Sequence, residues 1–158
     1  MDLFYHFFIG MIISKLFLGY YSLPVIISSG FIDIIGIIPF IVQKIINQPK
    51  KVIKDWLNGH VEFYSNTEKI VYRTTHSLLF AIFFTIICYI FFNKIGLIMG
   101  LANLSHLLID IFTHNNDFST RLFYPLSDFH IKGKNWNIKD PRFYLFWILG
   151  IVVFIIFI

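Results

Sequence analysis

The chain has 158 residues, of which 57% are hydrophobic and 20% aromatic, whereas only 14% are charged. This composition excludes an intrinsically disordered protein and argues against a soluble monomer, because 18.7 kDa cannot bury so much apolar surface. A single cysteine excludes a disulfide framework. A net charge of +4 in so apolar a chain is typical of basic groups at a membrane surface, so we expect no nucleic acid partner.

Five apolar stretches approach the length of about 20 residues that a transmembrane helix needs. In chain order they cover residues 3–21, 23–38, 77–92, 95–113 and 142–158. Several are short, which implies a thin or locally pinched bilayer. The sequence therefore predicts an all-α fold with a single domain over residues 1–158. That domain would be a multi-span transmembrane helical bundle of about five membrane helices, with the lipid bilayer as its partner.

The long segment 39–76 between the second and third stretches has its own organisation. Pro39 predicts that the second helix ends near residue 37, because the residue before a proline avoids helical backbone angles. Asn47-Gln48-Pro49 predicts another break. After it, apolar and charged side chains of residues 50–57 fall on opposite helical faces, which predicts an amphipathic helix lying in the membrane interface. An ordinary amphipathic helix packed on the protein is the alternative.

The basic residues predict how the chain is oriented in the membrane. The connections near residues 21–23 and 93–94 are very short, so both long polar segments, 39–76 and 114–141, fall on the side of the N-terminus. Eleven of the 13 lysines and arginines lie on that side: Lys44, Lys50, Lys51, Lys54, Lys69, Arg73, Arg121, Lys132, Lys134, Lys139 and Arg142. Because basic loops stay in the cytoplasm, we expect a cytoplasmic N-terminus and an outer C-terminus, in the inner or plasma membrane.

Ionisable residues within the apolar stretches are costly, at roughly 2.5–3.5 kcal/mol each near the bilayer centre, and are therefore candidates for function. Three histidines and two aspartates fall at one depth, near the cytoplasmic end of four predicted helices: His6, Asp33, His76, His106 and Asp110. His106 and Asp110 are four residues apart and so share a helix face, and His114 extends the same stripe. Asn103 lies near that stripe as a possible supporting partner.

Imidazole and carboxylate together are a ligand set that suits Zn²⁺ or a similar divalent ion. The convergence therefore favours a metal site that binds a divalent metal, most simply zinc. Each residue also has a plainer interpretation. His6 alone is typical of an interfacial histidine, Asp33 could form a structural ion pair with Lys15, and the spacing of His106 and Asp110 is common. No glycine-rich phosphate loop, GxSxG, CxxC or HExxH motif offers a competing chemistry.

Two longer motifs carry a resemblance to a known family. Thr75-His76-Ser77 opens an apolar helix, and Leu104-Ser105-His106 continues through Asp110 to Thr113 as a His-x-x-x-Asp-x-x-Thr pattern. Together with His6, Asp33, Arg73 and the Tyr124-Pro125 element, in this order, the chain resembles the YdjM-like family of inner-membrane metal-dependent hydrolases. That family is remotely similar to zinc-dependent phospholipases C and P1-type nucleases. The family pattern has a second Asp and a His where this chain has Ile35 and Gly36.

The resemblance implies that His6, Asp33, His76, His106 and Asp110 are metal ligands. The sequence thus predicts a membrane-bound metal-dependent hydrolase that uses a His/Asp metal site to activate water against a phosphoester or phospholipid substrate. Asp33 or Asp110 would accept the proton of that water. Arg73 would bind a phosphate oxygen of the substrate, or would simply be a cytoplasmic anchor. The alternatives are a membrane scaffold with a structural metal and an ion or solute transporter.

Overall fold

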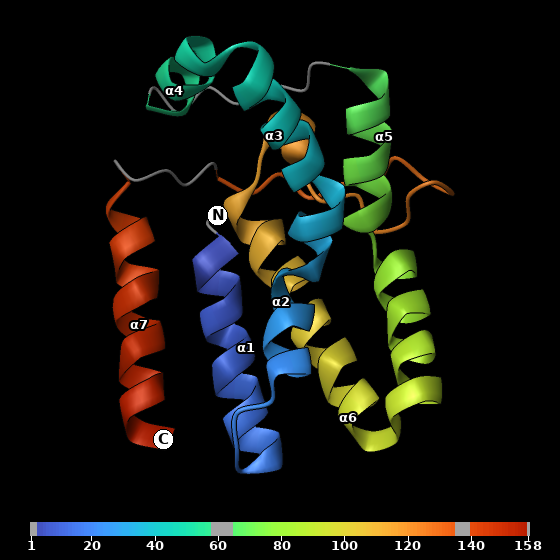
Figure 1. Cartoon of the computed structure of the whole chain (residues 1–158), viewed down its shortest axis with the longest axis vertical. Coiled ribbons are helices and arrows are strands. Elements are labelled where there is room, and N and C mark those ends of the chain that lie inside the picture. The colour runs from blue at the N-terminus through green and yellow to red at the C-terminus, as the bar shows by residue number, and fades with distance from the viewer. Residues whose placement is uncertain (1–2, 58–64, 135–139, 158) are drawn as a thin grey trace.

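The computed structural model describes residues 3–57, 65–134 and 140–157, and within these ranges the only regular elements are helices. In chain order they are α1 (Leu3–Leu18), α2 (Leu23–Gly36), α3 (Ile38–Asn47), α4 (Pro49–Leu57), α5 (Asn66–Thr75), α6 (Leu78–Thr113), the 3-10 helix η1 (Asn116–Phe118) and α7 (Pro141–Phe157) (Figure 1). The predicted all-α fold is confirmed. Lys139, counted above among the basic residues, lies outside the described ranges.

The centre of the bundle is formed by α1, α2 and α6, and α2 contacts both of the others (Figure 1). Two apolar clusters hold these helices together. The larger consists of Ile13, Val25, Cys88, Ile98, Met99 and Ala102, and the smaller of Ile32, Ala81 and Leu107. The helix α7 packs against α1, where the rings of Tyr5 and Phe8 contact that of Trp147. Apolar burial among these helices positions the polar residues described below.

The long helix α6 is a hairpin rather than a straight rod. Its chain leaves helical geometry at Asn93, which has φ 50° and ψ −125°, and the two arms run side by side (Figure 1). Gly96 in the second arm abuts the main chain of Cys88 in the first, and Gly100 abuts Thr85. Small residues of this kind let two helices approach closely. The predicted break at residues 93–94 is therefore confirmed.

The helices α2 and α3 are separated by a bend of 49°. Ile37, between them, has φ −129° and ψ −33°, and Pro39 stands at the start of α3. The predicted end of the second helix near residue 37 is confirmed. The structure differs in that the chain then continues as the helix α3, which no sequence signal above indicated. The break at Asn47-Gln48-Pro49 and the helix α4 that follows it are confirmed as well.

The prediction of about five membrane helices is not supported by the helix lengths. Among the described residues, α6 is the only single helix long and apolar enough to cross a membrane. If the bent pair α2–α3 counts as one span, there are two such segments. At 16 and 17 residues, α1 and α7 fall short of the usual length of about 20. One cause is Gly19, whose positive φ of 78° ends α1 earlier than the apolar pattern does.

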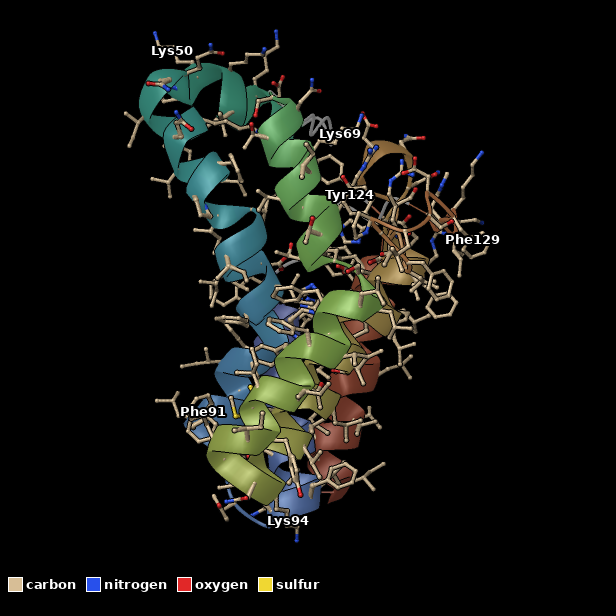
Figure 2. All side chains as sticks on the ribbon, turned by 90° about the vertical axis from the view of Figure 1, so that its right-hand side faces the viewer. Lys50, Lys69, Phe91, Lys94, Tyr124 and Phe129 are labelled. Carbon is tan, nitrogen blue, oxygen red and sulfur yellow. The ribbon has the colours of Figure 1, made fainter. Side chains whose placement is uncertain are left out.

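Basic side chains lie at the two ends of the molecule in unequal numbers. Lys50 and Lys69 lie at the end that carries α4 and α5, whereas Lys94 lies at the opposite end, at the tip of the α6 hairpin (Figure 2). Between them the outer faces are apolar, and side chains such as Ile90 and Phe91 are more than two-thirds exposed. This arrangement fits a protein whose middle is surrounded by lipid.

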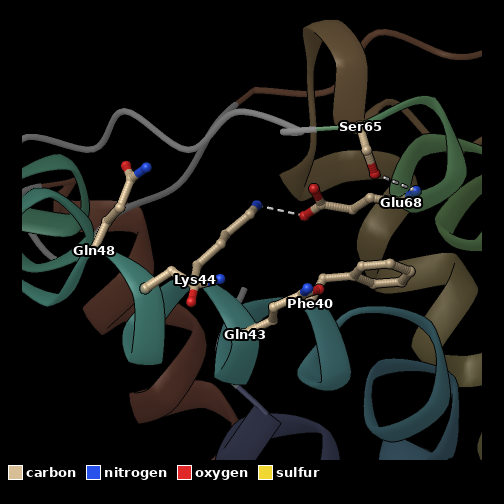
Figure 3. Close-up of a pocket in the computed structure, with 7 residues that line it drawn as sticks. Phe40, Gln43, Lys44, Gln48, Ser65 and Glu68 are labelled. Carbon is tan, nitrogen blue, oxygen red and sulfur yellow. Dashed lines mark hydrogen bonds and ion pairs between the residues drawn. The ribbon is translucent and has the colours of Figure 1, made fainter.

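The helix α5 is held over the bundle by polar contacts. Ser65 caps it by accepting a hydrogen bond from the main-chain N–H of Glu68. The Glu68 carboxylate, which is almost fully buried, forms an ion pair with Lys44 of α3 across a small pocket that Phe40 also lines (Figure 3). These contacts matter for the site because α5 ends at Thr75 and so positions His76.

Candidate metal centre

The structure brings all five predicted ligands together. They come from α1 (His6), α2 (Asp33), the α5–α6 junction (His76) and the second arm of α6 (His106 and Asp110). All but Asp33, at 16%, have side chains at most 1% exposed. Two overlapping groups have ligand atoms within 4.8 Å of one another, namely His6, Asp33 and His106, and His76, His106 and Asp110.

The Asp110 carboxylate is the most surrounded group of the cluster. Its Oδ2 lies 3.1 Å from His106 Nε2 and 3.6 Å from His76 Nε2. Its Oδ1 lies 3.6 Å from His6 Nε2. Four ring nitrogens therefore face one carboxylate when His114, whose Nδ1 lies 3.2 Å from Oδ1, is included.

Asp33 faces the same space from α2. Its Oδ1 lies 3.2 Å from His76 Nε2 and 3.7 Å from His106 Nε2. The alternative in which Asp33 pairs with Lys15 is wrong, because the Lys15 ammonium lies over the ring of Tyr21, 5.6 Å from its centroid. Asp33 is thus part of the cluster and is the more exposed of its two carboxylates.

Main-chain carbonyls fix the far side of two imidazole rings. His106 Nδ1 lies 2.7 Å from the carbonyl oxygen of Ser29, and His76 Nδ1 lies 3.0 Å from that of Tyr72. A carbonyl only accepts, so each Nδ1 must donate a proton to it. The neutral ring then has a lone pair on Nε2, directed at a carboxylate oxygen. Two acceptors at such distances repel each other unless a proton or a metal cation lies between them.

The hydrogen-bond inventory of the cluster indicates the same need for a cation. His106 Nε2, both carboxylate oxygens of Asp110 and His6 Nδ1 are buried and have no hydrogen-bond partner among the described residues. Leaving a buried polar group unpaired costs about 1–3 kcal/mol, and more for a charged one. The His6 and His106 rings stack at a centroid distance of 3.6 Å, so two positive charges on these rings would repel each other. These donors therefore fit a divalent ion such as Zn²⁺.

Several residues around the cluster were not singled out as ligands or were given another role. His114, which the sequence placed on the same stripe but not among the ligands, lies beside Asp110. Asn103 was expected as a supporting partner, but its Nδ2 donates to the Ser28 carbonyl oxygen at 3.3 Å, on the adjacent helix. The Tyr72 ring stacks on His76 at 3.9 Å. Burial raises the pKa of the Tyr72 phenol, so it stays protonated and donates to the Phe118 carbonyl.

Gly36 stands where the related family pattern has a histidine, and the structure gives a reason for a small residue here. A Cβ at this position would overlap the hydroxyl of Thr75 and lie 3.5 Å from His76 Cε1. The helix α2 thus passes directly against the turn that presents His76. A histidine at position 36 would require that turn to move.

Arg73, the predicted substrate-binding residue, lies on α5 one turn before His76. Its Nη2 is 3.8 Å from Asp117 Oδ1 in η1, and Lys69 Nζ lies 2.7 Å from the same oxygen. The Lys69 hydrogen bond, with the charges of Lys69 and Arg73, lowers the pKa of the Asp117 carboxyl. Arg73 therefore pairs with an aspartate of η1, and it lies three residues before His76 in the chain.

A bundle of apolar helices around a buried His/Asp cluster defines a helical membrane protein with a candidate metal centre. The chain belongs to the YdjM inner membrane protein family, which it matches over residues 1–158. This match confirms the family predicted from the motifs. No match was found among curated proteins or among solved structures. The more remote similarity to phospholipases C and P1-type nucleases stays a prediction.

Proposed function

We propose that the protein is a membrane-bound metal-dependent hydrolase acting on a phosphoester or lipid-type substrate at the cytoplasmic face. The observation that carries this proposal is the buried contact between His106 and Asp110. His106 Nε2 lies 3.1 Å from Asp110 Oδ2, and neither atom has a hydrogen-bond partner among the described residues. Such a contact is costly unless a proton or a metal cation lies between the two atoms, and ligands around a metal ion are commonly arranged in this way.

The ion would be held by His6, Asp33, His76, His106 and Asp110. Bound there, a divalent ion such as Zn²⁺ lowers the pKa of a water molecule toward about 7 and polarises a substrate oxygen. The Ser29 and Tyr72 carbonyls hold the His106 and His76 rings in the tautomer that exposes Nε2. Neutral donors presented in fixed orientations reduce the cost of assembling the site.

The two carboxylates have different roles in this proposal. Asp110, which is 1% exposed and surrounded by histidines, is a ligand only. Asp33, at 16% exposed, is the more accessible carboxylate, and it would accept a proton from the water that attacks the substrate. Arg73 would bind a phosphate oxygen in bidentate fashion once it leaves Asp117.

The topology that we propose has five membrane passes, with the two arms of α6 as separate passes. The two termini lie at opposite ends of the bundle (Figure 1), as an odd number of passes requires. The end with α4 and α5 carries Lys50 and Lys69, and the positive-inside rule assigns it to the cytoplasm. The helix α4 would then lie in the cytoplasmic interface.

Reporter fusions test this topology. An alkaline phosphatase fused after residue 158 is expected to be active, because it would lie outside the cytoplasm, whereas a fusion within residues 58–64 is expected to be inactive. A green fluorescent protein at the same two positions should give the opposite pattern. Cytoplasmic signals from both positions would contradict an odd number of passes.

Hydrolysis assays test the activity. Purified protein loaded with Zn²⁺ or Mn²⁺ is expected to hydrolyse one or more members of a panel of aryl phosphodiesters and short-chain phospholipids. His106→Ala should lose at least about 100-fold in rate, since it removes a group shared by both ligand sets. The control is His130→Ala, a half-buried loop histidine that bonds only the Asp128 carbonyl among the described residues.

A structural metal site in a membrane scaffold is the second candidate, and the depth of the cluster favours it. Four of the five ligands are at most 1% exposed, as in a closed structural site. The same assay separates the two functions. Metal bound in stoichiometric amount with no turnover of any substrate by any divalent ion would identify the scaffold.

A further inference from the structure

Two arginines outside the His/Asp cluster share an unusual arrangement. Arg73 Nη2 contacts Asp117 Oδ1 at 3.8 Å, and Arg121 Nη1 contacts the carbonyl and carboxylate of Asp128 at 3.0 Å each. The inner Nε of each guanidinium is buried and has no hydrogen-bond partner among the described residues. Among the described residues, each guanidinium thus pairs with one exposed aspartate, Arg73 with Asp117 of η1 and Arg121 with Asp128.

The hydroxyl groups of the two residues before Arg121 are also buried without a hydrogen-bond partner among the described residues. Ser119 and Thr120 are 1% and 0% exposed, and neither Oγ nor Oγ1 has a partner among the described residues. Hydroxyl and guanidinium groups buried without partners each cost free energy. Three of these groups belong to the consecutive residues 119–121, and the fourth is on Arg73 of α5, which contacts η1. Together they indicate a polar site that a ligand or water completes.

The segment that carries these groups is tied to the candidate metal centre. The Tyr72 hydroxyl donates to the Phe118 carbonyl at 3.1 Å, and the Leu78 N–H donates to the Leu122 carbonyl at 2.9 Å. Tyr72 stacks on His76, and Leu78 follows it by two residues. Residues 118–122 are therefore fastened on both sides of His76.

The charge around Asp117 is positive, and the Asp117 side chain itself is 57% exposed. Lys69 and Arg73 contact it directly, and Arg121 acts on it electrostatically. Lys69, Arg73 and Arg121 together face two exposed carboxylates, Asp117 and Asp128, so one positive charge is left uncompensated. A dianionic group with three or four oxygens would match these donors better than one carboxylate does.

We propose that Arg73, Arg121, Ser119 and Thr120 form a phosphate-binding subsite beside the metal centre, in which the Asp117 carboxylate is the occupant that an incoming phosphate group displaces. This inference rests on the proposed function for its substrate class, since it assigns the substrate's phosphate to these residues. It adds Arg121 and two hydroxyls as recognition groups and gives Asp117 a competing role.

Phosphate binding by the purified full chain tests the proposal, measured by isothermal titration calorimetry in detergent before and after removal of metal with a chelator. Inorganic phosphate is the first probe and dihexanoyl phosphatidic acid the second, so that a free phosphate and a lipid headgroup are distinguished. Arg121→Gln is expected to weaken binding roughly tenfold or more, through loss of charge-assisted hydrogen bonds. Asp117→Asn is expected to strengthen it severalfold.

Controls keep the outcome interpretable. Lys94→Gln removes a positive charge at the tip of the α6 hairpin, at the opposite end of the molecule (Figure 2), and should leave phosphate binding unchanged. Arg121→Lys keeps the charge but loses the planar guanidinium that can bind a phosphate with two hydrogen bonds, so it should show an intermediate loss of phosphate affinity. Thermal unfolding of every variant reports whether it is folded. Equal phosphate affinity in the wild type, Arg121→Gln and Asp117→Asn would overturn the subsite.

The subsite and the proposed function can fail separately. Protein that binds stoichiometric metal and hydrolyses a phosphoester, with phosphate binding insensitive to Arg121 and Asp117, would refute the subsite alone. Protein that binds no metal but binds phosphate through Arg121 would refute the hydrolase and leave the subsite standing.

Discussion

Asp110→Asn is expected to lower the affinity of the protein for Zn²⁺ by more than about 100-fold, because changes to groups that merely support metal ligands already cost about 10–100-fold. The amide has the same shape, so packing is kept. The charge is lost at the one carboxylate that four ring nitrogens face. Competition with a chromophoric zinc chelator measures the affinity, and Asp128→Asn, at a carboxylate that is 78% exposed, is the control.

Thermal unfolding should separate the wild type from the asparagine variant most clearly when metal is present. With metal, the wild type gains the binding free energy and the variant gains much less, so the difference between their unfolding midpoints should be larger than it is without metal. An equal difference in both forms, together with equal zinc affinity, would contradict a metal centre at Asp110.

The candidate site was predictable because the chain is so apolar. An ionisable residue in an apolar stretch is conspicuous, and placing each helix end with proline, loop length and basic charge gave a common depth for His6, Asp33 and His106. What could not be predicted is the support of the rings. The Ser29 and Tyr72 carbonyls hold the rings of His106 and His76. Every residue has a main-chain carbonyl, so the residue types do not indicate which carbonyl will contact a ring.

The fold was predictable in its elements and less so in their lengths and connections. Pro39 and the short connection at residues 93–94 marked the bends at residues 37 and 93 correctly. The helix α5 was missed, although Ser65 and Glu68 form the Ser-x-x-Glu pattern of a helix start. Apolarity alone overestimated the length of the first helix, because Gly19 ends it by a backbone conformation that hydropathy does not register.

Gly96→Ala is expected to destabilise the protein by about 1–3 kcal/mol, the usual cost of overpacking a core. The added Cβ would overlap the Cys88 carbonyl and lie 2.6 Å from the Tyr89 nitrogen. Both are main-chain groups inside a helix, so a change of side-chain rotamer cannot relieve the contact. The two arms of α6 must therefore separate, and thermal unfolding in detergent should register the loss as a lower midpoint.

The same substitution should also weaken metal binding, because the second arm of α6 carries His106 and Asp110 while His76 precedes the first arm. Separating the arms moves these ligands apart without touching any of them. Leu97→Ala is the matched control, since its side chain is half exposed on the outer face, and it should change neither the unfolding midpoint nor the zinc affinity appreciably. If Gly96→Ala behaved like this control, the arms would not be packed as the hairpin requires, and the convergence of the five ligands would lose its structural basis.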